Sequence, residues 1–289
     1  MEIRSRWRQD NYENIRTEMQ PGDVIAFSGT SVISTVIKLV TSSHVSHVGI
    51  IVPPDYLEDD DAGDGIVVAE ATESGIGPHS LSTRWNDNTV ENLWWLPLRA
   101  DLRTRLEENW ENFRQYLSDY NRAPYDYLQG AMLGLMLLEP TLDSVNSNLY
   151  ERIRQFIENI LNHESGADRQ EHERSILRSL RSMLRQSLND VDNDSILTGL
   201  LHLLLEDDTT ENLSRRLDNE EDFEHFFCSE FVTGALRSGG VTPNINPSEI
   251  TPIELCRFNI YEDNYTQFKR AEATRIRGFN CVDISRWEG

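Results

Sequence analysis

The stretch SHVGIIVPPDYLEDDDAGDGIVVAEA, residues 46–71, decides how the first part of the chain folds. It contains two apolar runs rich in β-branched residues, 47–52 and 66–71, which are typical of strands. Between them lie Pro53-Pro54 and the acidic run 59–61, which indicate a loop. We therefore predict an antiparallel hairpin.

The register of this hairpin decides which side chains meet. If Val52 pairs with Gly65, the antiparallel ladder places His47 opposite Glu70. A slipped register would change these pairs. In the predicted register, an imidazole and a carboxylate become neighbours across two strands.

Regular elements are also expected on both sides of the hairpin. Residues 24–27 follow a turn signal and suit a short strand, and residues 31–40 carry apolar side chains at helical spacing. A further strand is expected at 93–98 and a helix at 101–120. The fold class expected from these elements is α+β.

Residues 141–222 differ from the rest of the chain. They contain amphipathic segments with apolar stripes at helical spacing and no strand signals. Such stripes indicate core or helix–helix contacts and not a cofactor site, because the opposite faces carry Arg and Glu. We predict a helical insertion at 141–222 between an N-terminal part, 1–140, and a C-terminal part, 223–289, of one domain.

Cys228 is the best candidate for a nucleophile. Residues 226–237 are expected to form a helix that stops at Gly239-Gly240, and the tail beyond it to end in late β or turn segments. Cys228 lies near the start of this helix, where the positive end of the helix dipole stabilises a thiolate. The alternative is an inert, packed cysteine.

A thiolate nucleophile also needs an imidazole within hydrogen-bonding reach and a group that orients the imidazole. His47 and Glu70 can supply these two roles if the predicted hairpin forms. Taken singly, each has a simpler explanation, a histidine bonded to backbone or a solvated glutamate. Glu70 nevertheless lies inside the apolar run 66–71, where a charge needs a partner.

Five short motifs in a defined order carry a family resemblance. They are GDVIAF (22–27), SHVGIIV (46–52), VVAEAT (67–72), APYDYLQGA (123–131) and FCSEF (227–231). In this order the chain resembles the papain-like NlpC superfamily of cysteine hydrolases. The histidine motif precedes the cysteine motif, as in the circularly permuted branch with the YiiX-like and the lecithin:retinol acyltransferase-like proteins.

The resemblance implies a fold and a set of site residues. The fold is a permuted papain-like NlpC-type fold, with a small antiparallel sheet packed on the cysteine-bearing helix. Cys228 is implied as the nucleophile, His47 as the general base and Glu70 as the residue that orients His47. Tyr125 matches a Pro-Tyr element that holds substrate or oxyanion. Asp23 matches the Gly-Asp turn and is expected to be structural.

Two features depart from the family pattern. The insertion at 141–222 is larger than the family core requires and is a candidate to cap or block the cleft. Two other histidines also compete with His47, since His44 lies three residues before it and His225 lies three residues before Cys228. We favour His47 because it alone lies in the His-Val-Gly-Ile motif, where Gly49 permits close backbone packing.

Composition excludes several classes of function. The chain has 289 residues and a formal net charge of -22, which argues against nucleic acids and anionic membranes as partners. Three cysteines are too few for a disulfide framework. We expect no signal peptide and no transmembrane segment, because the longest apolar run, 130–138, is too short to cross a bilayer.

Two further features bear on environment and cofactors. Lys38 and Lys269 are the only lysines, and this depletion in an acidic chain is consistent with high salt or with selection against modifiable lysines. The acidic run 190–194 imitates a calcium loop but has Ser195 where glycine is needed, and His163 and His172 lack zinc spacing. We expect no metal and no cofactor.

We expect a cysteine peptidase or amidase that cleaves an amide bond, of the peptide or cell-wall peptide type. One alternative is a structural or binding component, for example of a virus particle, that retains the fold with or without activity. Another is a lipid acyltransferase or phospholipase-type thiol enzyme. The expected partners are a peptide, amide or acyl substrate and a protein bound through the insertion. The expected location is cytoplasmic by default, or within a larger assembly such as a virion.

Overall fold

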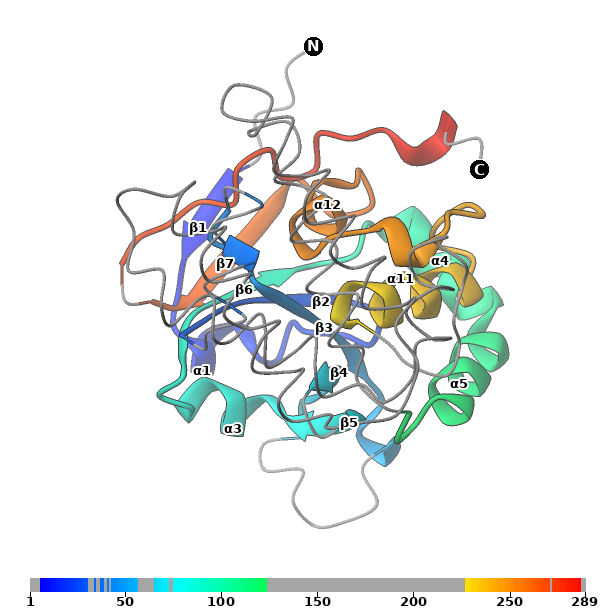
Figure 1. Cartoon of the computed structure of the whole chain (residues 1–289), viewed down its shortest axis with the longest axis horizontal. Helices are drawn as coiled ribbons and strands as arrows, with labels where there is room; N and C mark the ends of the chain where they lie inside the picture. Colours follow the sequence, from blue (N-terminus) through cyan, green and yellow to red (C-terminus); the bar gives the residue numbers. More distant parts are fainter. Residues whose placement is uncertain are drawn as a thin grey trace, which may run out of the picture.

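The computed structural model describes residues 6–30, 34, 37, 38, 41, 43–56, 65–72, 75–123, 227–270 and 272–286. The predicted insertion at 141–222 lies outside these residues, and so does Tyr125. The described residues form a mixed α+β structure in which helices cover a central sheet (Figure 1). The expected fold class is therefore confirmed at this level.

The sheet has seven strands in the order β1-β7-β6-β2-β3-β4-β5. In chain order they are β1 (Arg6–Gln9), β2 (Val24–Gly29), β3 (His47–Val52), β4 (Val67–Thr72), β5 (Gly75–Ser80), β6 (Val90–Leu96) and β7 (Asn264–Lys269). Neighbouring strands are antiparallel except β1 and β7, which are parallel. The sheet is thus larger than the small antiparallel sheet expected, and it is mixed. Because β7 pairs with β1 on one side and with β6 on the other, strands from the first and last parts of the chain lie in one sheet.

The β3–β4 hairpin forms as predicted, but its register differs from the predicted one. Val52 pairs with Val67 and not with Gly65. The loop is therefore two residues longer than predicted, because β4 begins at Val67. His47 does not lie directly opposite Glu70.

A shift of two residues leaves every side chain on the same face of the sheet, because side chains alternate with a period of two. Continuing the observed pairing beyond Ile50↔Ala69 places Gly49 opposite Glu70 and makes His47 its diagonal neighbour. A Cβ atom on Gly49 would lie 2.6 Å from a methyl group of Val68 and 3.2 Å from Cβ of Glu70. The glycine therefore gives β4 the space to approach β3 beside the histidine.

The predicted helix at 101–120 is divided into α4 (Ala100–Glu108) and α5 (Trp110–Asp119). Asn109 separates them, and its side-chain amide donates to the carbonyl of Arg105 at 2.9 Å. Such a side-chain bond to backbone competes with helix continuation. Three more short helices are α1 (Tyr12–Ile15), α3 (Leu81–Asn86) and α12 (Pro252–Arg257). Of the helix expected at 31–40, only residues 34, 37 and 38 are described, and they are helical.

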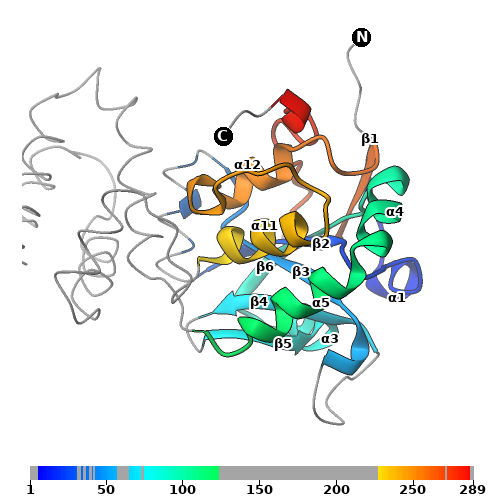
Figure 2. The same ribbon diagram turned by 90° about the vertical axis from the view of Figure 1, so that its right-hand side faces the viewer.

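Helix α11 (Cys228–Ser238) corresponds to the predicted cysteine helix and ends at Gly239-Gly240, as expected. It packs on one face of the sheet against β3 and β4, with α5 beside it (Figure 2). Gly234 makes the contact with α5 close, because the ring of Tyr116 occupies the space that a Cβ atom would fill. The first turns of α11 are consequently buried between sheet and helix.

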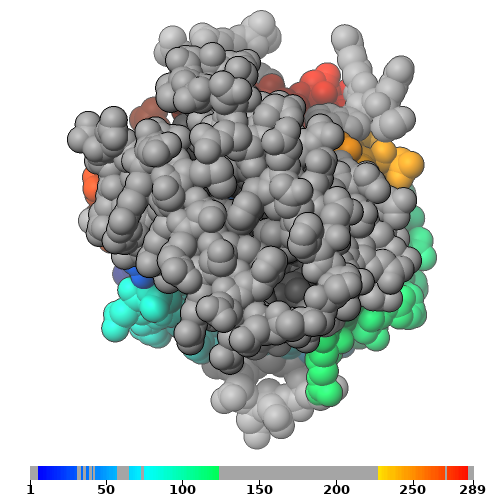
Figure 3. Space-filling model, in the orientation of Figure 1, coloured from blue at the N-terminus to red at the C-terminus, as the bar shows by residue number. Residues whose placement is uncertain are grey.

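Two apolar clusters hold the sheet from its two faces. The larger contains Val48, Ile50 and Ala69 together with Phe231 and Val232 of α11. The other contains residues of α1, α3 and the opposite strand faces, namely Tyr12, Ile15, Phe27, Val68, Leu81 and Trp95. In the space-filling view, α3 in cyan and α5 in green reach the surface on opposite sides (Figure 3). Among the described residues, no helix is long and apolar enough to cross a membrane.

Candidate active site

His47 is the first residue of β3, and its ring contacts Glu70 of β4. Nε2 of His47 lies 2.6 Å from Oε2 of Glu70, a short hydrogen bond. Glu70 is fully buried, whereas the ring of His47 is partly exposed. The structure therefore brings together the imidazole and the carboxylate that the sequence placed in one hairpin, as a diagonal pair and not a direct one.

Glu70 has a second cationic partner that the sequence analysis missed. Nε of Arg84 lies 2.8 Å from Oε1 of Glu70. A second guanidinium nitrogen, Nη2, donates to Oε2 at 3.2 Å. Because a buried carboxylate is unstable without such partners, Arg84 explains how the apolar strand β4 tolerates a glutamate.

Other contacts hold Arg84 in position. Its Nη1 donates to Asp87 Oδ2 at 3.0 Å, and its guanidinium lies 5.5 Å from the ring centre of Phe27. The same Phe27 ring meets the ring of His47 edge-on at 5.1 Å. Phe27 thus contacts both cationic partners of Glu70.

Arg84 gave little signal in the sequence. It lies in the short helix α3, in the polar segment LSTRWN, where an arginine is ordinarily solvated. The one available signal was Glu70 itself, since a glutamate inside an apolar strand requires a cation from elsewhere in the chain. Which of the chain's arginines supplies it depends on tertiary structure.

Cys228 is the first residue of α11 and is fully buried. Its side chain lies near enough to the ring of His47 to raise the pKa of that ring. Cys228, His47 and Glu70 therefore form a continuous chain of contacts across α11, β3 and β4.

The electrostatics of the cluster favour a charged imidazole. Burial opposes protonation of His47, but the nearby Cys228 sulfur and the hydrogen bond that the ring donates to Glu70 outweigh it and raise the pKa of His47 to about 9. Burial also disfavours the charged form of Glu70, yet the hydrogen bond from His47 and the charge of Arg84 lower its pKa to about 2. At neutral pH the pair is an imidazolium and a carboxylate.

The start of α11 offers backbone donors beside the thiol. The amide groups of Cys228 and Ser229 belong to the first turn, where no carbonyl within the helix can accept from them. The Ser229 hydroxyl donates to the carbonyl of Ile250, and Glu230 accepts from the amide of Phe227 at 3.2 Å. These bonds fix the helix start and leave its positive end near the sulfur.

His79 of β5 is a further titratable group near Glu70, and the sequence analysis did not select it. Its Nε2 atom is buried and has no hydrogen-bond partner among the described residues. Burial lowers the pKa of His79, so the ring is neutral at pH 7. His79 thus adds no charge to the cluster at neutral pH.

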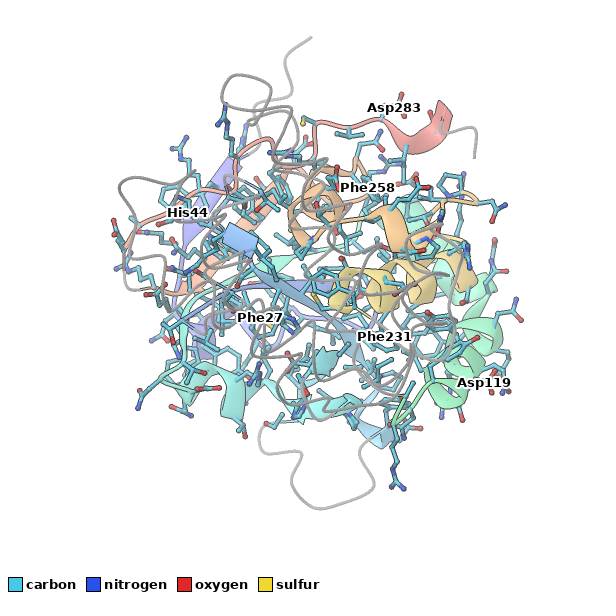
Figure 4. The ribbon with its side chains drawn as sticks, viewed as in Figure 1. Phe27, His44, Asp119, Phe231, Phe258 and Asp283 are labelled. Atoms are coloured by element: carbon cyan, nitrogen blue, oxygen red, sulfur yellow. The ribbon has the colours of Figure 1, made fainter. Side chains whose placement is uncertain are left out.

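The remaining candidates from the sequence lie elsewhere. His44 is exposed, and Figure 4 shows it away from Phe27, which lies against His47. His225 and Tyr125 lie outside the described residues. Asp23 is buried and accepts from the Trp95 indole and the Leu98 amide at 2.9 and 2.8 Å. Such contacts are those of the structural residue that was expected.

The described residues contain no group of three or more His, Cys, Asp or Glu side chains that could hold a metal ion. The acidic run 190–194, His163 and His172 lie outside them. No family model matches the chain, and no curated protein is significantly similar to it.

Proposed function

We propose that this protein is a cysteine hydrolase that cleaves an amide bond, with Cys228 as the nucleophile. The observation that carries the proposal is the position of the His47 ring, which is hydrogen-bonded to Glu70 and lies near enough to Cys228 for the sulfur to raise its pKa. A thiol beside an oriented imidazole at a helix start is the arrangement that thiol hydrolases need. The motif order of the permuted NlpC branch supports the same assignment.

The first step is attack of the Cys228 thiolate on the amide carbonyl carbon. The carbon–sulfur bond forms, the carbonyl electrons move to oxygen, and the tetrahedral intermediate then expels the amine. The His47 imidazolium gives its proton to the leaving nitrogen. The products of this step are a thioester on Cys228, a free amine and a neutral His47.

The second step is hydrolysis of the thioester. Neutral His47 removes a proton from water as the water oxygen attacks the thioester carbon, and the Cys228 thiolate leaves. A carboxylic acid is released, and the thiolate–imidazolium pair is restored. Glu70 keeps the ring oriented and stabilises its positive charge in both steps without taking the proton.

The oxyanion of each tetrahedral intermediate would be held by backbone amides of the first turn of α11, with that of Cys228 as the nearest candidate. Donors of this type are effective because they are fixed before the reaction begins. Each lowers the activation free energy by about 3 kcal/mol. By resemblance, Tyr125 would assist at this position.

The proposed substrate is a peptide or cell-wall peptide amide, as the resemblance implies. A chromogenic acyl ester tests the chemistry without knowledge of the natural substrate. We expect p-nitrophenyl acetate to leave one acetyl group on Cys228, detected by intact mass and peptide mapping. The modification should disappear in Cys228→Ser and slow strongly in His47→Gln, whereas Cys281→Ser should leave it unchanged. Acetylation that maps equally to Cys281 would contradict the proposal.

A second candidate function, a structural or binding component that retains the fold, is favoured by one specific observation. Cys228 is fully buried, which is also typical of an inert cysteine. The two functions differ in turnover. Release of p-nitrophenol beyond one equivalent, dependent on Cys228, supports the hydrolase, and a folded protein that is never acylated supports the structural role.

A further inference from the structure

We propose that Arg84 is a positioning residue of the thiol site, whose fixed positive charge balances Glu70 and so leaves the charge of His47 available to the Cys228 thiolate. This inference rests on the proposed function and deepens it. It assigns a role to a residue of α3 that belongs to none of the motifs of the resemblance.

The buried cluster holds four groups that can carry a charge. Two groups are anionic when the site is ready to react, the Glu70 carboxylate and the Cys228 thiolate. Two groups are cationic, the His47 imidazolium and the Arg84 guanidinium. With all four present the cluster is neutral, which is the condition under which charges are tolerated away from water.

Removal of the Arg84 cation would disturb this charge balance. Without Arg84, a single imidazolium would have to compensate both Glu70 and Cys228. The cluster would then carry a net negative charge, and it would take up a proton to remove that charge. Whether the proton goes to the sulfur or to the carboxylate, the thiolate beside an oriented imidazolium becomes rarer at neutral pH.

The contacts of Arg84 are those of a cation held in a fixed position beside Glu70. Two nitrogens of Arg84 contact the two oxygens of Glu70, Nε as an ion pair at 2.8 Å and Nη2 by a hydrogen bond at 3.2 Å, and a lysine could not offer two nitrogens. Asp87 and the ring of Phe27 hold the guanidinium from its other sides. Arg84 acts through Glu70, since the Glu70 carboxylate lies between it and the ring of His47.

The neighbouring charged groups do not change the count. The carboxylate of Asp87, in the loop after α3, pairs with Arg84 at 3.0 Å, and Lys269 of β7, whose ammonium donates to the Asp87 backbone carbonyl at 2.5 Å, is a second cation beside it. His79 of β5 is neutral at pH 7 because burial lowers its pKa. Glu230 of α11 is bonded to the amide of Phe227. None of these four groups is substituted in the variants compared below, but Arg84→Met also removes the partner of the Asp87 carboxylate.

The test is the pH profile of Cys228 alkylation by iodoacetamide, followed by mass spectrometry on the full chain and normalised to its plateau. Normalisation removes differences in access to the buried sulfur. In Arg84→Met the midpoint should move to higher pH, because the cluster loses a compensating positive charge. Arg84→Lys keeps the positive charge, so its midpoint should stay close to that of the wild type even if the side chain packs less well.

A double variant separates charge balance from a merely structural role. In Arg84→Met combined with Glu70→Gln, one anion and one cation are both removed, so the remaining pair of Cys228 and His47 is again neutral. The midpoint should return toward that of the wild type, although the double variant is the more altered protein. Arg114→Met is the matched control, because Arg114 pairs with Asp55 on the surface and should leave the profile unchanged.

The outcomes distinguish this inference from the proposed function. If wild-type Cys228 is alkylated no more readily at neutral pH than the exposed Cys281, the proposed thiol chemistry itself fails. If Cys228 is reactive and Arg84→Met leaves the midpoint in place, the role of Arg84 is overturned while the hydrolase stands. The role of Arg84 is also overturned if the double variant is shifted as far as Arg84→Met, because the effect is then structural.

Discussion

Glu70 carries a negative charge at a position that water does not reach. Its carboxylate is held by the ring of His47 at 2.6 Å and by the guanidinium of Arg84 at 2.8 Å. Breaking a buried pair by removal of one partner is more costly than the pair itself is worth, because the other charge is left without compensation. Glu70 is therefore as important to the fold as to the site.

Replacement of Glu70 by alanine should lower the free energy of unfolding by about 3 to 5 kcal/mol, the usual cost of leaving buried charges unpaired. Asp55→Ala is the matched control, because it breaks an exposed ion pair with Arg114 and should cost no more than about 1 kcal/mol. Urea denaturation of both variants measures the difference. Equal losses of stability would show that the Glu70 cluster is not a compensated buried network.

The three residues of the proposed catalytic chain could be selected from the sequence for physical reasons. A glutamate in an apolar strand conflicts with its surroundings and needs a partner. A cysteine at a helix start gains reactivity from the helix dipole, and a histidine at the start of the neighbouring strand can pair with both. Arg84 gives no such signal, because an arginine on a short polar helix is ordinarily solvated. Its role depends on the way α3 packs against β4, which no local pattern contains.

At the scale of elements, the close approach of β3 and β4 determines the geometry of the site. Gly49 is the residue that permits it, since a methyl group there would collide with Val68 and crowd the side chain of Glu70. Overpacking of this kind forces backbone shifts in a close-packed interior. The hairpin would have to separate just where His47 reaches Glu70.

Gly49→Ala should destabilise the protein by about 1 to 3 kcal/mol through overpacking, and it should also slow acylation of Cys228. Gly77→Ala on β5 is a sharp control. Gly77 pairs with Glu70 from the other side, but a Cβ atom there would meet nothing within 4 Å. Thermal unfolding and the acetylation assay should therefore separate the two alanine variants. Equal behaviour would contradict the packing described for Gly49.

The strands differ in how well the sequence predicts them. The bounds of β3 are as predicted, because its apolar, β-branched run is buried on both faces. Strand β5 has two glycines and a proline in GIGPHS, and β1 reads RWRQ, so neither has a strand pattern, and both lie at sheet edges. The hairpin register was wrong by two residues because the acidic loop carries no apolar pattern to fix its length.

At the scale of the whole molecule, the cluster links protonation to folding. The pKa of His47 is raised from 6.5 to about 9, so its contribution to stability is complete below pH 6.5 and is lost as the pH rises through 9. The pKa of Glu70 is lowered from 4.5 to about 2, so its contribution is present above pH 4.5 and is lost as the pH falls through 2. Together the two groups favour a stability maximum between these windows.

The difference in unfolding free energy between the wild type and His47→Gln should depend on pH. The difference isolates one histidine from the many carboxylates of a chain with a net charge of -22. It should be largest below pH 6.5 and should shrink as the pH is raised to 9, because the imidazolium is then lost. Denaturant unfolding at a series of pH values measures it. A difference that grows with pH would mean that the folded protein prefers neutral His47.

The most direct test of the thiolate–imidazolium pair is a nuclear magnetic resonance titration of His47 in labelled full-length protein, assigned with His47→Gln. In the wild type we expect the ring to titrate with a pKa of about 9. In Cys228→Ser the pKa should fall clearly, because the ring loses the sulfur that raises it. A ring that titrates near 6.5 in both proteins would contradict the ion pair on which the proposed chemistry depends.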